Sequence, residues 1–135
     1  KRKTFNNLLK EKLNIEKVIN YYGLVEQIGS IFFECKCGYF IASNFSEIII
    51  RDENFKECSD GKSGIVQLLS LLPTSYPGHS ILTEDTGEIV KNHNCNCYGH
   101  GTRFLIHGRL KNAELRGCSN IWIMNNSKIN YLVGK

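Results

Sequence analysis

The sequence lacks an apolar run that approaches the length of a membrane span, and it lacks an export signal. A transmembrane helix requires about 20 consecutive apolar residues. The N-terminus is the charged run Lys1-Arg2-Lys3, with no apolar signal segment behind it. These absences argue against a membrane-spanning or exported protein, and they predict a cytoplasmic one. Because the chain begins at Lys1 rather than Met, we also expect it to be a piece of a longer protein.

The sequence also lacks an excess of charge, a basic stripe, an internal repeat and a low-complexity tract. Its formal net charge is +4, and lysines are interspersed with Asp and Glu along the chain. This pattern argues against a nucleic-acid or anionic-membrane partner, so a zinc-ribbon nucleic-acid binder is the weakest of the functions considered. A length of 135 residues indicates one domain that can bury a core.

Apolar residues at helical spacing predict two short helices between residues 4 and 22, on either side of Asn14. Asn14 is the expected N-cap of the second helix. Gly23 interrupts the pattern, so residues 21–29 are expected to form a loop that leads into a strand at residues 30–35.

Beyond that point, alternating and β-branched runs separated by turn residues predict a β-rich region. The expected strands are residues 30–35, 39–42, 47–51, 64–72, 79–84, 87–90, 102–110 and 121–124. The predicted fold class is therefore α+β: a distorted antiparallel barrel or sheet preceded by two short helices. We expect one domain over residues 1–124 and a short polar tail over residues 125–135.

Four of the six cysteines form two C-x-C pairs, Cys35 with Cys37 and Cys95 with Cys97. In a chain without an export signal, such pairs favour metal ligands or free thiols over disulfides. Zinc prefers four soft ligands in a tetrahedron, and two C-x-C units on separate turns can supply them. We predict a structural zinc that clamps the two ends of the β region together; the alternative is four unrelated, partly buried thiols.

The residues around these pairs are less specific. Gly38 and Gly99 follow the two pairs closely, as backbone turns around a metal often require. His93 or His100 could replace one cysteine as a ligand, although a histidine is more often an ordinary surface or core residue. Cys58 lies in a polar, turn-like segment and is expected to be an ordinary thiol.

Three short motifs follow one another in the order found in acyl-adenylate-forming enzymes. YGLVE at residues 22–26 resembles their aromatic-Gly-x-x-Glu loop, TED at residues 83–85 their Thr-x-Asp turn, and GR at residues 108–109 their Gly-Arg hinge. Each motif is common by chance, and each residue in it has a structural alternative as a core, capping or solvated residue. Their shared order makes the combination more specific than any single motif.

The resemblance implies a role for five residues. The Tyr22 ring, in the loop with Gly23, would stack near adenine, and Glu26 would face magnesium or phosphate. Asp85 would hold the ribose hydroxyls, and Arg109 would contact the nucleotide.

Longer phrases extend the resemblance to a family. Residues 21–35, 64–89 and 95–119 resemble the C-terminal part of the catalytic domain of the LuxE acyl-protein synthetases, a family of the acyl-adenylate-forming superfamily. Those enzymes activate a fatty acid with ATP and hold the acyl group as a cysteine thioester until a partner reductase takes it. The resemblance therefore implies ATP or AMP with Mg²⁺ as cofactors. In some related phenylacetate-type ligases, cysteines and a histidine at similar places are thought to bind zinc.

Two features of the superfamily have no counterpart in the sequence: the upstream phosphate-binding loop and the mobile C-terminal lid. We therefore expect this chain alone not to complete adenylation. Cys118 is the predicted acyl-accepting thiol, because it follows Arg116 and Gly117 and nearby arginines favour the thiolate. The alternative is a buried Cys118 in a last strand.

Other functions remain open. The chain could be a non-catalytic, zinc-stapled interaction module that docks an acyl carrier or a fatty-acid reductase, or part of a phenylacetate-type acyl-CoA ligase. A domain cut from a larger one would expose apolar surface, so homo-oligomers are also expected.

Overall fold

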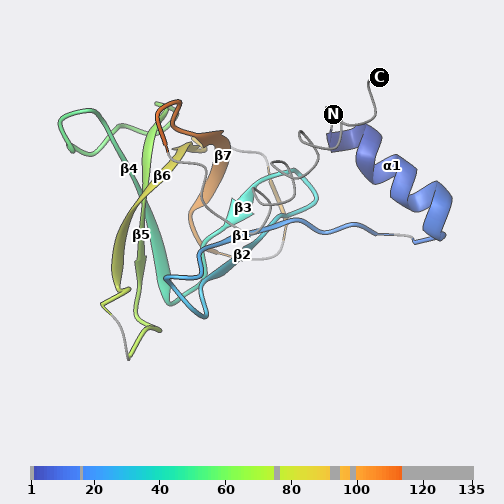
Figure 1. The fold of residues 1–135 in the computed structure, drawn as a ribbon, viewed down its shortest axis with the longest axis horizontal. Helices are drawn as coiled ribbons and strands as arrows, with labels where there is room; N and C mark the ends of the chain where they lie inside the picture. The colour runs from blue at the N-terminus through green and yellow to red at the C-terminus, as the bar shows by residue number, and fades with distance from the viewer. Residues whose placement is uncertain (1, 16, 75–76, 92–94, 98–99, 114–135) are drawn as a thin grey trace, which may run out of the picture.

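The structure, a computed structural model, describes residues 2–15, 17–74, 77–91, 95–97 and 100–113. It is mostly β-sheet with one short helix (Figure 1). The predicted strand at residues 121–124 and the tail at residues 125–135 lie outside the described residues. Within the described ranges, no helix is long and apolar enough to span a membrane. The elements are α1 (Arg2–Leu13), β1 (Tyr21–Gly23), β2 (Ile31–Phe33), β3 (Phe40–Ile41), β4 (Ser46–Arg51), β5 (Gly64–Ser70), β6 (Ser80–Ile89) and β7 (Arg103–Arg109).

The second predicted helix is wrong. Helix α1 ends at Leu13, and Asn14 has a φ of 51°, so it occupies the left-handed position that follows a helix rather than the N-cap position that begins one. No helix follows Asn14 in the described part of residues 15–22, and Tyr21 and Tyr22 belong to strand β1. Figure 1 shows α1 set apart from the strands.

The predicted loop at residues 21–29 is wrong in its first three residues. Tyr21 pairs with Phe33 and Gly23 with Ile31 in an antiparallel two-stranded sheet, β1–β2. The remaining residues, 24–29, do form the loop. Buried Gln27 fastens this loop to the connection between β5 and β6: its Nε2 donates to the carbonyl oxygen of Gly78 at 2.8 Å.

The larger sheet has five antiparallel strands in the order β3-β7-β6-β5-β4. Its pairings are antiparallel throughout, as the sequence predicts. Strand β4 has the alternation expected of a strand with one buried face. Ser46, Ile48 and Ile50 are buried while Glu47 is exposed, because successive side chains point to opposite faces of the sheet.

One predicted turn lies inside a strand. The sequence divides residues 79–90 into two strands around an acidic turn, whereas β6 runs without a break from Ser80 to Ile89. Its pairing with β7 is irregular between Thr86 and Gly87. A Cβ at Gly87 would lie 2.3 Å from the carbonyl oxygen of Leu105, so the close approach of the two strands there requires glycine. Asp85 therefore projects from a paired strand next to a bulge.

The core lies where the β1–β2 hairpin packs on the larger sheet. Phe32 of β2 and Phe104 of β7 are fully buried, and their ring centroids are 5.4 Å apart in an edge-to-face arrangement. Burial of each such side chain contributes about 1.5–3 kcal/mol. The other buried members of the cluster are Phe40, Ala42, Ile48, Ile50, Cys58, Val66 and Leu68.

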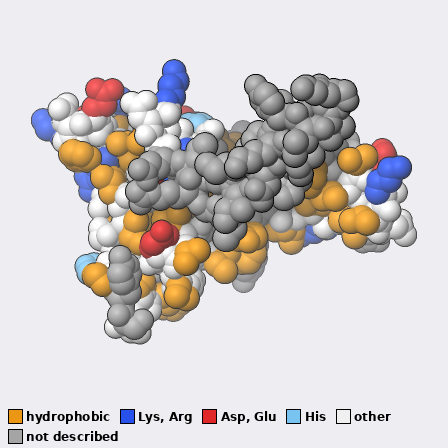
Figure 2. All heavy atoms as spheres, in the orientation of Figure 1, with side chains coloured by type: hydrophobic (Ala, Val, Ile, Leu, Met, Phe, Trp, Pro, Cys, Tyr) orange, Lys and Arg blue, Asp and Glu red, His pale blue; other side chains and the backbone are white. Residues whose placement is uncertain are grey.

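Many large apolar side chains remain on the surface. Figure 2 shows hydrophobic side chains on this face of the molecule, including over α1. On the hairpin, Tyr21 and Phe33 are 67% and 59% exposed, and because they are paired partners their side chains share one face.

Candidate functional site

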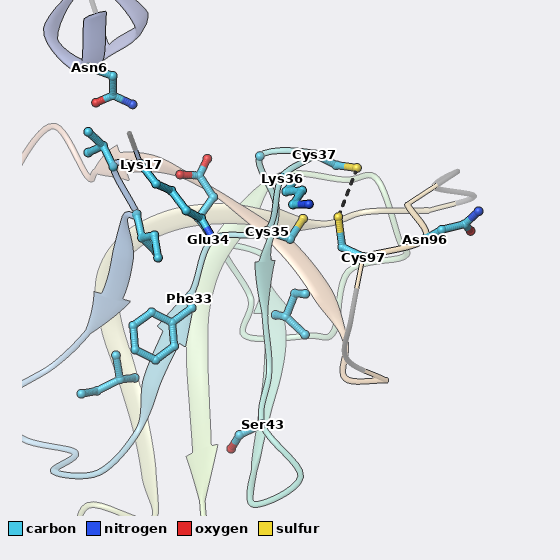
Figure 3. A pocket seen from close by; sticks show the side chains of 15 residues that line it. Asn6, Lys17, Phe33, Glu34, Cys35, Lys36, Cys37, Ser43, Asn96 and Cys97 are labelled. Atoms are coloured by element: carbon cyan, nitrogen blue, oxygen red, sulfur yellow. Dashed lines mark hydrogen bonds between the residues drawn. The ribbon is translucent and has the colours of Figure 1, made fainter. Parts of the chain in front are cut away.

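The four cysteines of the two C-x-C pairs lie together. Their sulfurs are all within 4.8 Å of one another. Cys35 Sγ lies 3.6 Å from Cys95 Sγ, and Cys37 Sγ lies 3.6 Å from Cys97 Sγ. Figure 3 shows the Cys35, Cys37 and Cys97 side chains turned toward one another at the edge of a hollow. We call these four residues the cysteine cluster.

A tight turn presents the first pair of the cysteine cluster. The amide of Cys35 donates to the carbonyl oxygen of Tyr39 at 2.8 Å, and the amide of Gly38 donates to that of Cys35 at 2.9 Å. Gly38 has a φ of 88°, which L side chains rarely adopt, so the turn after the first C-x-C requires glycine as predicted. Gly99, the expected counterpart after the second pair, lies outside the described residues.

Arg103 supports the second pair. This arginine is buried at the start of β7, and its Nη2 donates to the carbonyl oxygen of Cys97 at 3.1 Å. The guanidinium also lowers the pKa of the Cys95 thiol. A cation therefore lies against the cluster, where it offsets the negative charge that thiolates bring.

The pKa values of three thiols in the cluster are shifted, and not in the same direction. The Cys95 and Cys97 sulfurs beside it raise the pKa of Cys37 to about 12. Burial, followed by contact with Cys95, raises the pKa of Cys35. Burial opposes ionisation of Cys95 too, but the amide of Cys97 and Arg103 outweigh it and lower its pKa to about 6. The surroundings therefore favour the thiol form of Cys35 and Cys37 and the thiolate form of Cys95, whereas a bound divalent cation would favour the thiolate form of all four cysteines.

The donor set and the spacing fit zinc. Four sulfurs at Zn–S distances of about 2.3 Å form a tetrahedron with edges of roughly 3.8 Å, and the two short sulfur–sulfur distances of 3.6 Å are close to that value. The cluster can therefore hold a metal of this kind. His100 is exposed and is not among the clustered ligands, while His93 lies outside the described residues.

Cys58 is not part of this cluster. It is buried in the hydrophobic core, and its amide donates to the carbonyl oxygen of Ile50 at 2.8 Å. The polar composition of its neighbours predicts a turn, but the buried thiol packs as a small apolar side chain.

A second group of candidate residues meets where β6 pairs with β7. Asp85 and Arg109 are opposed in the register of these strands. The Asp85 amide donates to Thr83 Oγ1 at 3.0 Å, and the Thr83 hydroxyl donates to the carbonyl oxygen of Val66 at 2.8 Å. This chain of hydrogen bonds fixes the backbone from which the half-buried Asp85 side chain projects.

Tyr22 reaches the same place from β1. Its hydroxyl donates to Asp85 Oδ2 at 2.7 Å, although the two residues are 63 positions apart in the sequence. Its ring packs against Phe32, Phe40 and Phe104, with centroid separations of 6.2, 6.1 and 6.2 Å. We call Tyr22, Asp85 and Arg109 the carboxylate site.

The guanidinium of Arg109 makes an ion pair beside Asp85. Arg109 Nη2 lies 2.5 Å from Glu84 Oε2, and both side chains are substantially exposed. The amide of Leu110 also donates to the carbonyl oxygen of Glu84 at 2.8 Å. The carboxylate site therefore opens to solvent on its Arg109 side, where a charged ligand could reach it.

The other predicted site residues lie elsewhere. Gly23 ends β1 next to Tyr22, and Glu26 is exposed in the following loop. Among the described residues, no hydrogen bond or ion pair joins Glu26 to Asp85. Cys118 lies outside the described residues, so its predicted role stays a prediction.

Two buried polar residues were missed from the sequence. Arg103 lies in an apolar run that predicts a strand, and which face of that strand is buried depends on partners far along the chain. Gln27 lies inside the YGLVEQ stretch, but sequence reasoning assigned it no role. For Arg103, the available signal was a charged residue at the edge of an apolar strand. For Gln27, it was an amide residue in a Gly-containing loop.

The hollow beside the cysteine cluster is separate from the carboxylate site. It has a volume of about 1440 Å³, and Cys35, Cys37 and Cys97 contribute to its wall (Figure 3). Exposed Ile31 and Phe33 of β2 line it as well. Since none of Tyr22, Asp85 and Arg109 lines the hollow, we do not assign the nucleotide to it.

Comparison with known proteins identifies the family. No curated protein and no solved structure matches the chain. The family described as "Acyl-protein synthetase, LuxE" matches residues 1–127. This match covers both the cysteine cluster and the carboxylate site, and the chain belongs to the LuxE acyl-protein synthetase family.

Proposed function

We propose that the chain forms part of an ATP-dependent acyl-protein synthetase that activates a fatty acid as an acyl adenylate and transfers it to a cysteine thioester. The observation that supports this function most directly is the meeting of Tyr22, Asp85 and Arg109 from three separate motifs. Family membership supports the reaction class, and the carboxylate site supports nucleotide recognition by this chain.

In the activation step, a carboxylate oxygen of the fatty acid attacks the α-phosphorus of ATP, and pyrophosphate leaves. The protein must align two anions and offset the charge at phosphorus. In our proposal Asp85 accepts hydrogen bonds from the ribose hydroxyls, and Arg109 faces the nucleotide as a cation. Glu26 is the proposed ligand of the Mg²⁺ that would neutralise the phosphates.

We further propose that the cysteine cluster holds a structural zinc. The cation would compensate four thiolates, and the adjacent Arg103 would offset part of the remaining negative charge. The zinc would join the turn before β3 to the segment before β7. It would thereby hold together the two strands that supply Phe40 and Phe104 to the packing around Tyr22.

The nucleotide role of Asp85 predicts the effect of Asp85→Asn. Loss of the charged acceptor should raise the Kd for AMP by about 10-fold or more, since hydrogen bonds to charged groups contribute about 1.5–3 kcal/mol. Isothermal titration or ligand-detected NMR with AMP measures the change. Glu88→Gln is the matched control, because it makes the same carboxylate-to-amide change on the same strand, where Glu88 faces His107. Equal AMP binding by Asp85→Asn and the unaltered chain would remove Asp85 from nucleotide recognition.

The acyl-transfer step can be tested without the missing phosphate loop. We expect the chain to become labelled when it is given a preformed, radiolabelled fatty acyl-AMP. The Cys118 thiolate would attack the acyl carbon, the bond from that carbon to the phosphate oxygen would break, and AMP would leave. Hydroxylamine should release the label, and Cys118→Ser should lose it while Cys58→Ala keeps it. Hydroxylamine-sensitive label that persists in Cys118→Ser would exclude Cys118 as the acceptor.

A non-catalytic interaction module is the second candidate function. The exposed apolar face of the β1–β2 hairpin, with Tyr21, Ile31 and Phe33, favours it as a surface for a reductase or acyl carrier. The AMP titration separates the two candidates, since a docking module would bind neither AMP nor acyl-AMP.

A further inference from the structure

We propose that Tyr22 is a positioning residue whose hydroxyl orients the Asp85 carboxylate toward the ribose, rather than a platform on which adenine stacks. This inference rests on the proposed nucleotide role of Asp85 and deepens it. It assigns the contribution of Tyr22 to a single hydroxyl group, which one conservative substitution can remove.

The contact between the two residues is direct. The distance from Tyr22 Oη to Asp85 Oδ2 is 2.7 Å, which is the short separation typical of a hydroxyl that donates to a carboxylate. It joins β1 of the hairpin to β6 of the larger sheet, and these are different sheets. The orientation of the carboxylate therefore depends on how the hairpin sits on the sheet.

The ring of Tyr22 is held by the core. The Phe32 ring is stacked at 30°, the Phe104 ring meets Tyr22 edge-on at 75°, and the Phe40 ring is tilted at 48°. Two of these neighbours are in β2 and β7, and the third is in β3. Packing from three strands fixes where the hydroxyl points, whereas adenine stacking would need a ring face that the core leaves open.

The proton stays on Tyr22. Burial, and then the hydrogen bond and negative charge of Asp85, raise the pKa of the Tyr22 hydroxyl above its usual value of about 10. The hydroxyl is therefore a permanent donor at any pH at which a nucleotide would bind. Asp85 remains the acceptor of this pair.

The arrangement leaves Asp85 able to bind a diol. A carboxylate offers about four lone-pair sites, and the Tyr22 hydroxyl uses one of them on Oδ2. Thr83 also accepts a hydrogen bond from the Asp85 amide, so Asp85 is held at its backbone as well as at its carboxylate. The ribose hydroxyls would then meet a preoriented acceptor and would not have to order it on binding.

The test compares AMP with 2′,3′-dideoxy-AMP, which keeps the adenine and the phosphate but lacks the ribose diol. In Tyr22→Phe the Kd for AMP should rise about 10- to 150-fold, as expected for one lost hydrogen bond to a charged group, while the Kd for 2′,3′-dideoxy-AMP should be unchanged. Tyr21→Phe is the matched control, because Tyr21 is the preceding residue on the same strand and points into solvent. In an Asp85→Asn background, Tyr22→Phe should have little further effect.

Other outcomes overturn the inference in distinguishable ways. If Tyr22→Phe binds AMP like the unaltered chain, the positioning role is wrong and the proposed function stands. If both nucleotides lose affinity equally, Tyr22 acts through the fold or through adenine, and the inference also fails. If the unaltered chain does not bind AMP, the proposed function fails and the inference falls with it. A thermal melt of each variant shows that the comparison is made between folded proteins.

Discussion

Removal of the metal from the cysteine cluster is expected to unfold much of the β-rich domain. The cluster joins residues 60 positions apart, so the proposed zinc would close a long loop that the metal-free chain must close by packing alone. Structural zinc contributes about 10–16 kcal/mol in small zinc-binding peptides, whereas whole domains are stable by only about 5–15 kcal/mol. We therefore expect a strong chelator to abolish cooperative unfolding or lower the Tm by tens of degrees.

Elemental analysis and circular dichroism measure this effect. The purified chain should contain about one zinc per molecule, and Cys37→Ser or Cys95→Ser should lose both the metal and the cooperative melt. His100→Ala is the matched control, because His100 is a nearby potential ligand that is exposed and lies outside the cysteine cluster. A metal-free chain that melts like the metal-loaded one would rule out a structural zinc.

The cysteine cluster is also the feature that the sequence predicted best. The proximity of Cys35 and Cys37 to Cys95 and Cys97 could be predicted from ligand chemistry. Four ligands of one metal must lie close together, whatever path the chain takes between the two C-x-C pairs. Arg103 could not be found in the same way. Its role depends on which face of β7 is buried, and that face is set by pairing with β3 and β6.

The N-terminal half shows where periodicity fails. Residues 15–22 have helical spacing, but β-branched Ile15, Val18 and Ile19 are poor helix formers, and Asn14 adopts the left-handed conformation that ends α1. Pairing of β1 with β2 then outweighs the local pattern. The strand pattern was more reliable in β4 and β5, where alternating burial coincides with β-branched residues.

The carboxylate site was predicted in its members but not in its geometry. The motifs identified Tyr22, Asp85 and Arg109, yet a turn was expected around Asp85 and a nucleotide-stacking ring at Tyr22. In the structure Asp85 lies in a continuous strand beside a bulge, and its irregular pairing depends on the close contact of Gly87 with β7. Strand pairing places Asp85 and core packing holds the Tyr22 ring, and single-sequence motifs encode neither contact.

The core prediction with the largest effect concerns Phe104. Phe104→Ala should destabilise the domain by about 3–5 kcal/mol, because it removes a fully buried ring and leaves a cavity among closely packed neighbours. Chemical denaturation of the metal-loaded chain measures the change. Phe33→Ala is the control, since Phe33 is 59% exposed on the hairpin and its loss should change stability by about 0.5 kcal/mol or less.

Phe104 also connects stability to the carboxylate site. Its ring meets that of Tyr22, so the cavity in Phe104→Ala would let the Tyr22 hydroxyl move away from Asp85. We therefore expect the variant to bind AMP more weakly under conditions in which it remains folded, with little change for 2′,3′-dideoxy-AMP. A folded Phe104→Ala that keeps full AMP affinity would mean that the Tyr22–Asp85 contact does not depend on the aromatic packing around it.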